Sequence, residues 1–231
     1  MSRPRRHIND TRALVALGER IVGCRRCERL VSWCAEIARD KRAAYANEDY
    51  WARPVAGFGD PSARLVVVGL APGAHGANRT GRVFTGDRSG QWLYRALHRA
   101  GFANQPTSIA RDDGLALRDA WVTVCVRCAP PDNKPTPAER DACLPFLVDE
   151  LTSLRRARVL VCLGRFAWDG VLRALAGDAR PRFTHAAEAG VAGYTLVGSY
   201  HPSQQNTFTG KLTEPMLDAV FARARTLVAD A

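Results

Sequence analysis

The stretch RLVVVGLAPGAHGANRTGRVFTGDRSG, at residues 64–90, decides the fold class of this chain. Its first seven residues make a continuous apolar run of strand length, typical of a parallel strand buried on both faces. A loop with four glycines follows at 71–88, and a helical pattern then starts at Ser89. A buried strand, a loop and a helix in this order predict the first part of a βαβ unit.

The same alternation continues to the end of the chain. Apolar, β-branched runs predict three more strands, at residues 120–127, 157–163 and 194–199. Helical patterns lie at 11–22, 29–46, 89–100, 137–154, 165–176 and 214–228. This alternation predicts an α/β fold with a mostly parallel sheet, whose ligands bind at the carboxyl ends of the strands. Three unusual loops are expected to meet at that edge, at 71–88, 128–137 and 201–209.

Length and composition favour a single domain. Of the 231 residues, 46% are hydrophobic, which excludes a disordered protein. Residues 1–60 are predicted to be a helical extension that supplies a Cys-x-x-Cys pair to the same domain, and 61–231 to form the α/β unit. No apolar run approaches the roughly 18 residues of a membrane-spanning helix, and the N-terminus lacks the apolar segment of a secretory signal. We therefore expect a cytoplasmic protein with no membrane partner.

The net charge of +10 favours an anionic partner, with nucleic acid ahead of a membrane surface. Of the 33 basic residues, 30 are arginines. A guanidinium can bind a phosphate through two hydrogen bonds and stack on bases, which suits contact with DNA. An arginine-rich genome would produce the same excess, so the charge alone does not identify the partner.

The cysteines predict a metal site. Seven cysteines without a secretory signal argue against a disulfide framework. Cys24 with Cys27, and Cys125 with Cys128, have the spacing that brings two thiolates to one zinc ion or iron–sulfur cluster. Cys125 lies within a predicted strand, whereas Cys128 and Cys143 lie near loops, so Cys24, Cys27, Cys128 and Cys143 are the favoured ligands. The others are expected to be small core residues, Cys34, Cys125 and Cys162.

The glycine-rich loop matches no nucleotide-binding or hydrolase motif. It lacks GxGxxG, the Walker sequence and a GxSxG elbow, so no nucleotide cofactor is expected. Its candidate functional side chains are Asn78, Phe84 and Asp87, for which an Asx-turn, a core anchor and a helix cap are the structural alternatives. For Asp87 we favour the cap. His201 follows the fourth predicted strand and could donate a hydrogen bond to an anion that develops in the site.

These segments are similar to the motifs of the uracil-DNA glycosylase superfamily, and specifically of its family 5. The similarity lies in GLAPGAHGANRTGRVFTGD at 69–87 and HPSQQN at 201–206. It extends to RCAPPDNKPTP at 127–137, which precedes Cys143, and to the first Cys-x-x-Cys pair. The resemblance implies a three-layer αβα sandwich with a four-stranded sheet. It also implies a [4Fe–4S] cluster on the four favoured cysteines and a monofunctional enzyme that excises uracil from single- or double-stranded DNA.

Two departures from related families bear on the mechanism. The residue that is an acid or Asn in related families is Ala71 here, so Asn78 is expected to orient the water and His201 to stabilise the leaving base. An Asn that reads uracil in related iron–sulfur glycosylases is replaced by Val124, beside Thr123. Loose specificity that includes hypoxanthine and ethenocytosine is therefore expected. The substrate pocket is predicted from Gly69, Ala71, Pro72, Gly73, His75, Phe84, Thr123 and Ser203, with Phe84 stacking on the flipped base.

The DNA contacts are expected at the same edge of the sheet. The phosphate contacts are predicted to be Arg79, Arg82, Arg88 and Arg127, each of which has a solvated surface charge as its alternative. One of Gln204, Gln205 and Asn206 is expected to fill the gap left by the flipped base. The cluster is expected to pin the extension and the 128–143 loop against DNA, in a monomeric, nucleoid-associated protein. The competing interpretations are a metal-stapled damage-binding protein without turnover and a structural zinc module.

Overall fold

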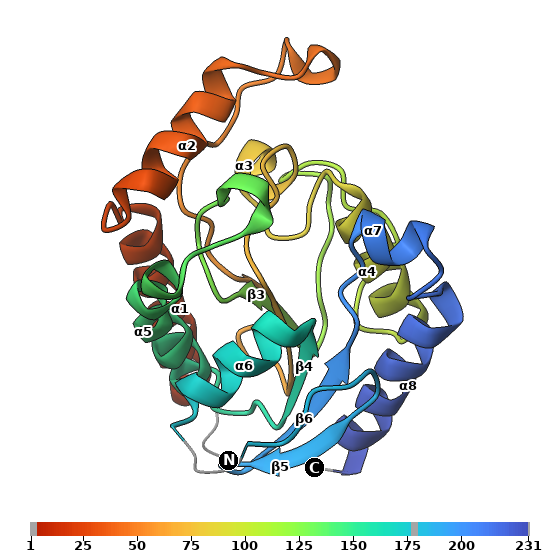
Figure 1. Cartoon of the computed structure of the whole chain (residues 1–231). Coiled ribbons are helices and arrows are strands. Elements are labelled where there is room, and N and C mark those ends of the chain that lie inside the picture. The colour runs from red at the N-terminus through yellow and green to blue at the C-terminus, as the bar shows by residue number, and fades with distance from the viewer. Residues whose placement is uncertain (1–3, 177–179, 231) are drawn as a thin grey trace.

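The computed structural model describes residues 4–176 and 180–230. Within these residues, six strands form one mixed sheet in the order β1-β3-β2-β4-β6-β5. Their bounds are β1 (Phe58–Gly59), β2 (Leu65–Gly69), β3 (Ala120–Val124), β4 (Val159–Leu163), β5 (Glu188–Val191) and β6 (Tyr194–Ser199). The central strands β3, β2, β4 and β6 are parallel, and they are the four that the sequence predicts. The α/β fold class is confirmed (Figure 1).

Two short antiparallel strands at the edges extend the predicted four-stranded sheet. β1 pairs with β3 over only two residues. β5 forms a hairpin with β6, and its turn places Ala192 and Gly193 at φ values of 49° and 83°. Two positive φ values suit a two-residue turn whose twist matches the strands. An Ala-Gly pair is a weaker hairpin signal than Asn-Gly, which explains why the sequence did not predict this strand.

Helices cover both faces of the sheet, which gives the expected three layers (Figure 1). One face is covered by α5 (Pro137–Ser153) and α6 (Arg165–Ala174), with α1 (Pro4–Val22) packed along α5. The opposite face is covered by α4 (Arg88–Arg99) and α8 (Glu214–Asp230). Because side chains alternate along a strand, Val66 and Val68 pack toward α5 and α6, and Val67 packs toward α4 and α8. None of the described helices has the length and apolarity needed to cross a bilayer.

The helix predicted at 29–46 is α2 (Glu28–Arg39). The loops also contain two short helices that the sequence did not predict, α3 (Ala77–Thr80) and α7 (Gln204–Phe208), and 3-10 turns lie at η1 (Ala43–Tyr45) and η2 (Pro131–Asn133). The helix expected at 29–46 ends at Arg39 because the chain turns back toward α3. There the backbone N–H groups of Trp51 and Ala52 donate to the carbonyls of Arg79 and Asn78.

Candidate functional site

Phe84 and His201 meet at the carboxyl ends of the parallel strands. Their ring centroids are 6.0 Å apart, with the ring planes tilted by 32°. Phe84 is buried and lies in the left-handed region at φ 52°, a conformation that is costly for a side chain of this size and clusters at functional sites. A Cβ atom at Gly69 would lie only 2.5 Å from Cζ of Phe84. The Phe84 ring therefore fits against the end of β2 only because residue 69 is glycine.

Burial controls the protonation of His201. Desolvation lowers the pKa of His201 to about 4, so its imidazole is neutral at pH 7. A neutral imidazole offers one N–H donor and one acceptor nitrogen. The backbone is fixed by Asn206, whose Nδ2 donates to the carbonyl of His201 at 2.9 Å. Asn206 in turn lies in α7, which Ser203 caps by accepting the Asn206 N–H at 3.3 Å. The loop after β6 therefore presents a rigid, uncharged donor.

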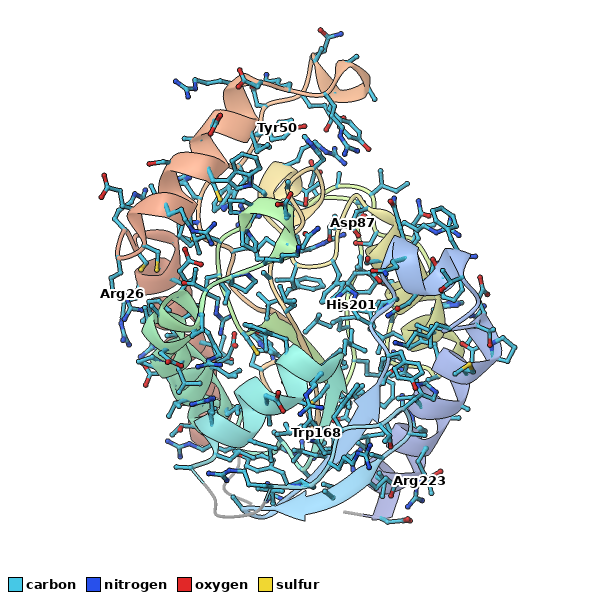
Figure 2. All side chains as sticks on the ribbon, viewed as in Figure 1. Arg26, Tyr50, Asp87, Trp168, His201 and Arg223 are labelled. Carbon is cyan, nitrogen blue, oxygen red and sulfur yellow. The ribbon has the colours of Figure 1, made fainter. Side chains whose placement is uncertain are left out.

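Asp87 caps the helix that leaves the glycine-rich loop. Its Oδ1 accepts the N–H of Gly90 at 2.8 Å, so the cap that we favoured from the sequence is present. Its Oδ2 lies against Gly73 and Gly76, where any Cβ atom would press on the carboxylate. Burial raises the pKa of Asp87, opposed by the N–H groups of Gly90 and Ser89. In the view of Figure 2, Asp87 lies above His201, and both lie above Trp168 and Arg223.

Asn78 is almost fully enclosed, with 1% of its surface exposed. Its backbone N–H donates to Gly73 at 3.0 Å, and its Nδ2 donates to the carbonyl of Cys34 at 3.4 Å. Its Oδ1 is buried with no hydrogen-bond partner among the described residues. Buried polar atoms are rarely left unpaired, so this oxygen is a candidate acceptor for a water or a substrate group.

The segment between α2 and β1 covers the His75 side chain, so His75 does not line an open pocket. The hydroxyl of Tyr50 lies 2.9 Å from its Nδ1, and the ring of Tyr45 stacks on it. Burial lowers the pKa of His75, and the charges of Arg42 and Arg79 lower it further. His75 is thereby engaged in holding this segment against the glycine-rich loop.

Three of the four predicted phosphate contacts are interior residues, which corrects that expectation. Arg82 is 4% exposed and pairs with Asp113 at 2.8 Å. Arg79 is buried, pairs with Glu48 and donates to the carbonyls of His75 and Gly86. Burying a charge requires a partner, and these carboxylates supply it. The two arginines therefore fix the glycine-rich loop from inside.

Arg127 and Thr123 belong to a buried network on the far side of β3 from Phe84. Arg127 is 1% exposed and donates to Glu150 at 2.7 Å and to Thr123 at 2.5 Å. The hydroxyl of Thr123 donates to Glu150 at 2.5 Å. Because side chains alternate along a strand, Val124 faces Phe84 and Thr123 faces α5. Thr123 and Arg127 are therefore engaged inside the protein, an arrangement that does not favour the predicted roles of base contact and phosphate contact.

Arg88 is the predicted phosphate contact that lies nearer the surface. Its Nε donates to Thr207 at 3.3 Å, and its guanidinium lies 4.3 Å from the ring centroid of Phe208. Phe208 is 68% exposed, an unusual position for a Phe beside a predicted active edge. Sequence reasoning missed it, although an aromatic residue in the loop after the last central strand was an available signal. Gln204 and Gln205 lie on the same helix and are exposed.

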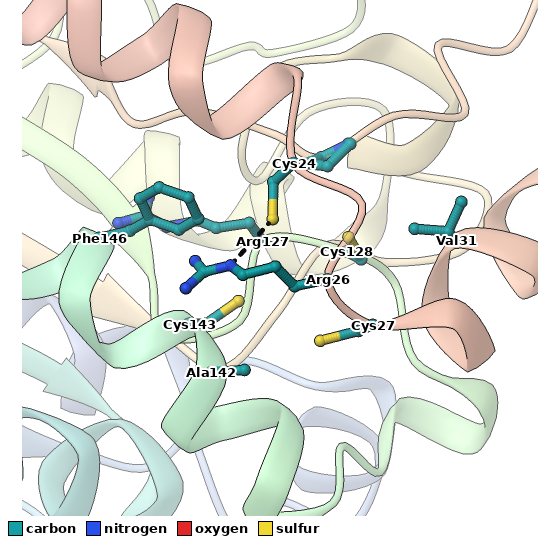
Figure 3. Close-up of a pocket in the computed structure, with 10 residues that line it drawn as sticks. Cys24, Arg26, Cys27, Val31, Arg127, Cys128, Ala142, Cys143 and Phe146 are labelled. Carbon is teal, nitrogen blue, oxygen red and sulfur yellow. Dashed lines mark hydrogen bonds between the residues drawn. The ribbon is translucent and has the colours of Figure 1, made fainter.

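The four favoured cysteines line one pocket at the ends of α2 and α5 (Figure 3). Arg26 lies among them, and its Nε donates to Sγ of Cys24 at 3.3 Å. Among the described residues, no group of three or more His, Cys, Asp or Glu side chains is arranged to hold a metal ion. The cysteines that were expected in the core, Cys34, Cys125 and Cys162, are buried and are not among the residues that line this pocket.

Comparisons with known proteins agree with the geometry. The sequence model of the uracil DNA glycosylase superfamily matches residues 56–225. A type-5 uracil-DNA glycosylase from Mycobacterium tuberculosis is 54% identical over 88% of this chain and 78% of its own length. Type-5 enzymes from Thermus thermophilus and Pyrobaculum aerophilum are 49% and 46% identical, over 92% and 89% of this chain and 97% and 89% of their own lengths. With matches of this extent, the chain belongs to the uracil DNA glycosylase superfamily, and within it to the type-5 family.

Proposed function

We propose that this chain is a monofunctional DNA glycosylase that hydrolyses the N-glycosidic bond of uracil in DNA and leaves an abasic site. The observation that carries the proposal is the pairing of Phe84 with a neutral, partly buried His201 at the carboxyl edge of the sheet. A base inside a duplex is out of reach of such an edge, so it must first be flipped out, at a cost of a few kcal/mol. The expected setting is the nucleoid in the cytoplasm, and the expected state is a monomer.

Each residue at this edge then has a distinct task. Phe84 stacks on the flipped base, in a position that Gly69 keeps open. Negative charge develops on a carbonyl oxygen of the departing base, and this oxygen accepts a hydrogen bond from the His201 N–H. The base leaves with the bonding electron pair, water adds to the sugar cation and gives up a proton to the solvent, and the released base anion takes up a proton to become the neutral base.

Asn78 orients the water in this proposal. Ala71 has no group that can hold a water, whereas Oδ1 of Asn78 is a buried acceptor that lacks a partner within the described part of the chain. An amide oxygen is not a base at neutral pH, so its contribution is position rather than proton abstraction. A sugar cation is electrophilic enough for a positioned water to react.

Base choice is expected to be loose. Val124 faces Phe84 and can offer a base only apolar contact, and Thr123 is engaged with Glu150 on the opposite face. A site without a side-chain hydrogen bond to the base discriminates mainly by shape. Hypoxanthine and ethenocytosine are therefore proposed as further substrates.

Gap filling is assigned to α7. Gln204, Gln205 and Phe208 lie on this short helix, which follows His201 directly. The exposed Phe208 suits insertion at a base step because apolar side chains serve as wedges there. Arg88 is stacked on Phe208. Of the four arginines that the sequence predicts to contact phosphate, it is the one that this proposal retains.

The cysteine pocket is proposed to hold a [4Fe–4S] cluster on Cys24, Cys27, Cys128 and Cys143. Four thiols around one pocket are the donor set of such a cluster. The cluster would tie the N-terminal extension to α5. A brown protein with absorbance near 400 nm and about four irons per chain would support this proposal, and zinc at one per chain would contradict it.

The decisive experiment is incubation with a duplex that carries one uracil, followed by alkali. Strand cleavage at the uracil, together with release of the free base, is expected for the wild type. Tight binding of the duplex without release would favour the damage-binding alternative. Parallel duplexes with hypoxanthine or ethenocytosine test base choice, and cleavage of the uracil duplex alone would contradict loose specificity.

A further inference from the structure

Two exposed arginines lie over one indole beside the glycine-rich loop. The guanidinium carbon of Arg53 is 4.2 Å from the ring centroid of Trp51, and that of Arg111 is 4.5 Å from it. Both arginines are exposed, and among the described residues neither has a carboxylate partner. We call Trp51, Arg53 and Arg111 the Trp51 platform.

The platform is fixed to the loop that carries Phe84. The backbone N–H of Trp51 donates to the backbone carbonyl of Arg79 at 2.9 Å. The indole lies against Gly81, where a Cβ atom would be 2.8 Å from its Cδ2. The carbonyl of Arg111 accepts a hydrogen bond at 3.1 Å from the buried Arg82. The interior arginines that were expected to bind phosphate thus hold the exposed ones in place.

Asp113 makes the second side of the platform rigid. Its carboxylate pairs with Arg82 and accepts the N–H groups of Ile109, Ala110 and Leu115 at 2.7 to 3.3 Å. This turn carries Arg111 and is also bonded to the glycine-rich loop, because the N–H of Gly86 donates to the carbonyl of Ser108 at 3.0 Å. Little conformational entropy remains to be lost when the arginines bind a ligand.

We infer that the Trp51 platform binds backbone phosphates of the DNA strand that enters the site, an inference that rests on the proposed function. A guanidinium stacked on a ring by its face keeps its N–H donors free at its edge, and these match phosphate oxygens in pairs. Two unpaired cations at the proposed active edge are suited to a polyanion. The platform thereby replaces Arg79, Arg82 and Arg127 as the source of electrostatic affinity.

The test is the salt dependence of binding to a uracil-containing duplex. For Arg53→Gln/Arg111→Gln, we expect the slope of log affinity against log salt concentration to fall by about two units, near 0.9 per phosphate contact. Binding at low salt should weaken on the order of tenfold. Arg53→Lys/Arg111→Lys keeps both charges and should retain most of the slope.

Arg223→Gln is the matched control. Arg223 is an exposed arginine paired with Glu188 at the opposite end of the molecule from His201 (Figure 2), and its loss should leave the slope and uracil release unchanged. A wild-type slope in the double Gln variant, with its thermal unfolding midpoint unchanged, would overturn the inference, as would a Lys variant that loses as much slope. The proposed function fails separately, if the wild type binds duplex but releases no base.

Discussion

At the scale of single residues, the site combines groups that are uncharged at neutral pH. Burial keeps His201 neutral, and neither Asn78 nor Ala71 carries a charge. Such a site cannot abstract a proton strongly, and it acts through position and hydrogen bonding. The rate of uracil excision should therefore depend little on pH near neutrality and strongly on small changes in the geometry of the site.

The His201 side chain should give uracil excision a flat pH profile near neutrality. Its pKa lies below the ordinary 6.5, at about 4. The imidazole therefore stays neutral as the pH falls from 8 to 5 and becomes protonated only near 4. We expect single-turnover rates that are constant between pH 5.5 and 8. A rate that falls on raising the pH through 6.5 would show that the charged imidazolium is the working form.

The Asn78 side chain should matter through its oxygen. Asn78→Ala removes the buried acceptor and is expected to lower the single-turnover rate by on the order of 100-fold, the usual effect of losing one positioned group. Asn78→Asp keeps an oxygen acceptor and should retain more activity than the Ala variant. Affinity for an abasic duplex serves as the control and should change little. An unchanged rate in Asn78→Ala would remove this residue from the mechanism.

At the scale of elements, the glycine-rich loop and α4 form one unit joined by Asp87. The same carboxylate caps the helix and supports the two glycines of the loop. The loop's position at the end of β2 is predictable from the sequence, because a strand, a loop and a cap are local features. The path of the loop, which places Phe84, is not predictable from the sequence, because Arg79 and Arg82 pair with carboxylates that are distant along the chain.

Asp87→Ala should destabilise the protein by about 1–2 kcal/mol through loss of the cap. Asp87→Asn keeps an acceptor for the Gly90 N–H and should cost less. Because burial raises the pKa of Asp87 above its unfolded value, its contribution to stability is greatest at low pH and is lost as the pH rises through the folded-state pKa. Urea unfolding at pH 3.5, below the ordinary carboxyl pKa, and at pH 8 should therefore show a smaller loss for Asp87→Asn at pH 8. An equal loss at both values would contradict this assignment.

At the scale of the whole molecule, buried ion pairs add to the hydrophobic contacts between the sheet and its helices. Arg127, which follows β3, pairs with Glu150 of α5 inside the protein, and Arg127 also lines the cysteine pocket. The net charge of +10 therefore does not indicate which arginines lie on the surface, because several arginines pair with carboxylates inside the protein.

Breaking the Arg127–Glu150 pair on one side should be strongly destabilising. Glu150→Ala leaves a buried guanidinium unpaired, and a loss of about 3–5 kcal/mol is expected. Replacing both partners, as in Arg127→Met/Glu150→Leu, should cost less than the single change because no charge remains buried. Urea unfolding of the three proteins measures both effects. A double variant less stable than Glu150→Ala would show that the pair contributes more than charge compensation.

The sequence alone determined the central strands, the main helices, the cap at Asp87 and the four cysteines that share a pocket. These features follow from local periodicity, from turn chemistry and from short spacings, which depend little on the rest of the chain. Only the tertiary structure decided which arginines lie inside and which face solvent. That choice depends on carboxylates brought close by folding, as Asp113 is to Arg82 and Glu150 to Arg127. A guanidinium with such a partner can be buried, and one without it stays in water, free to bind a phosphate.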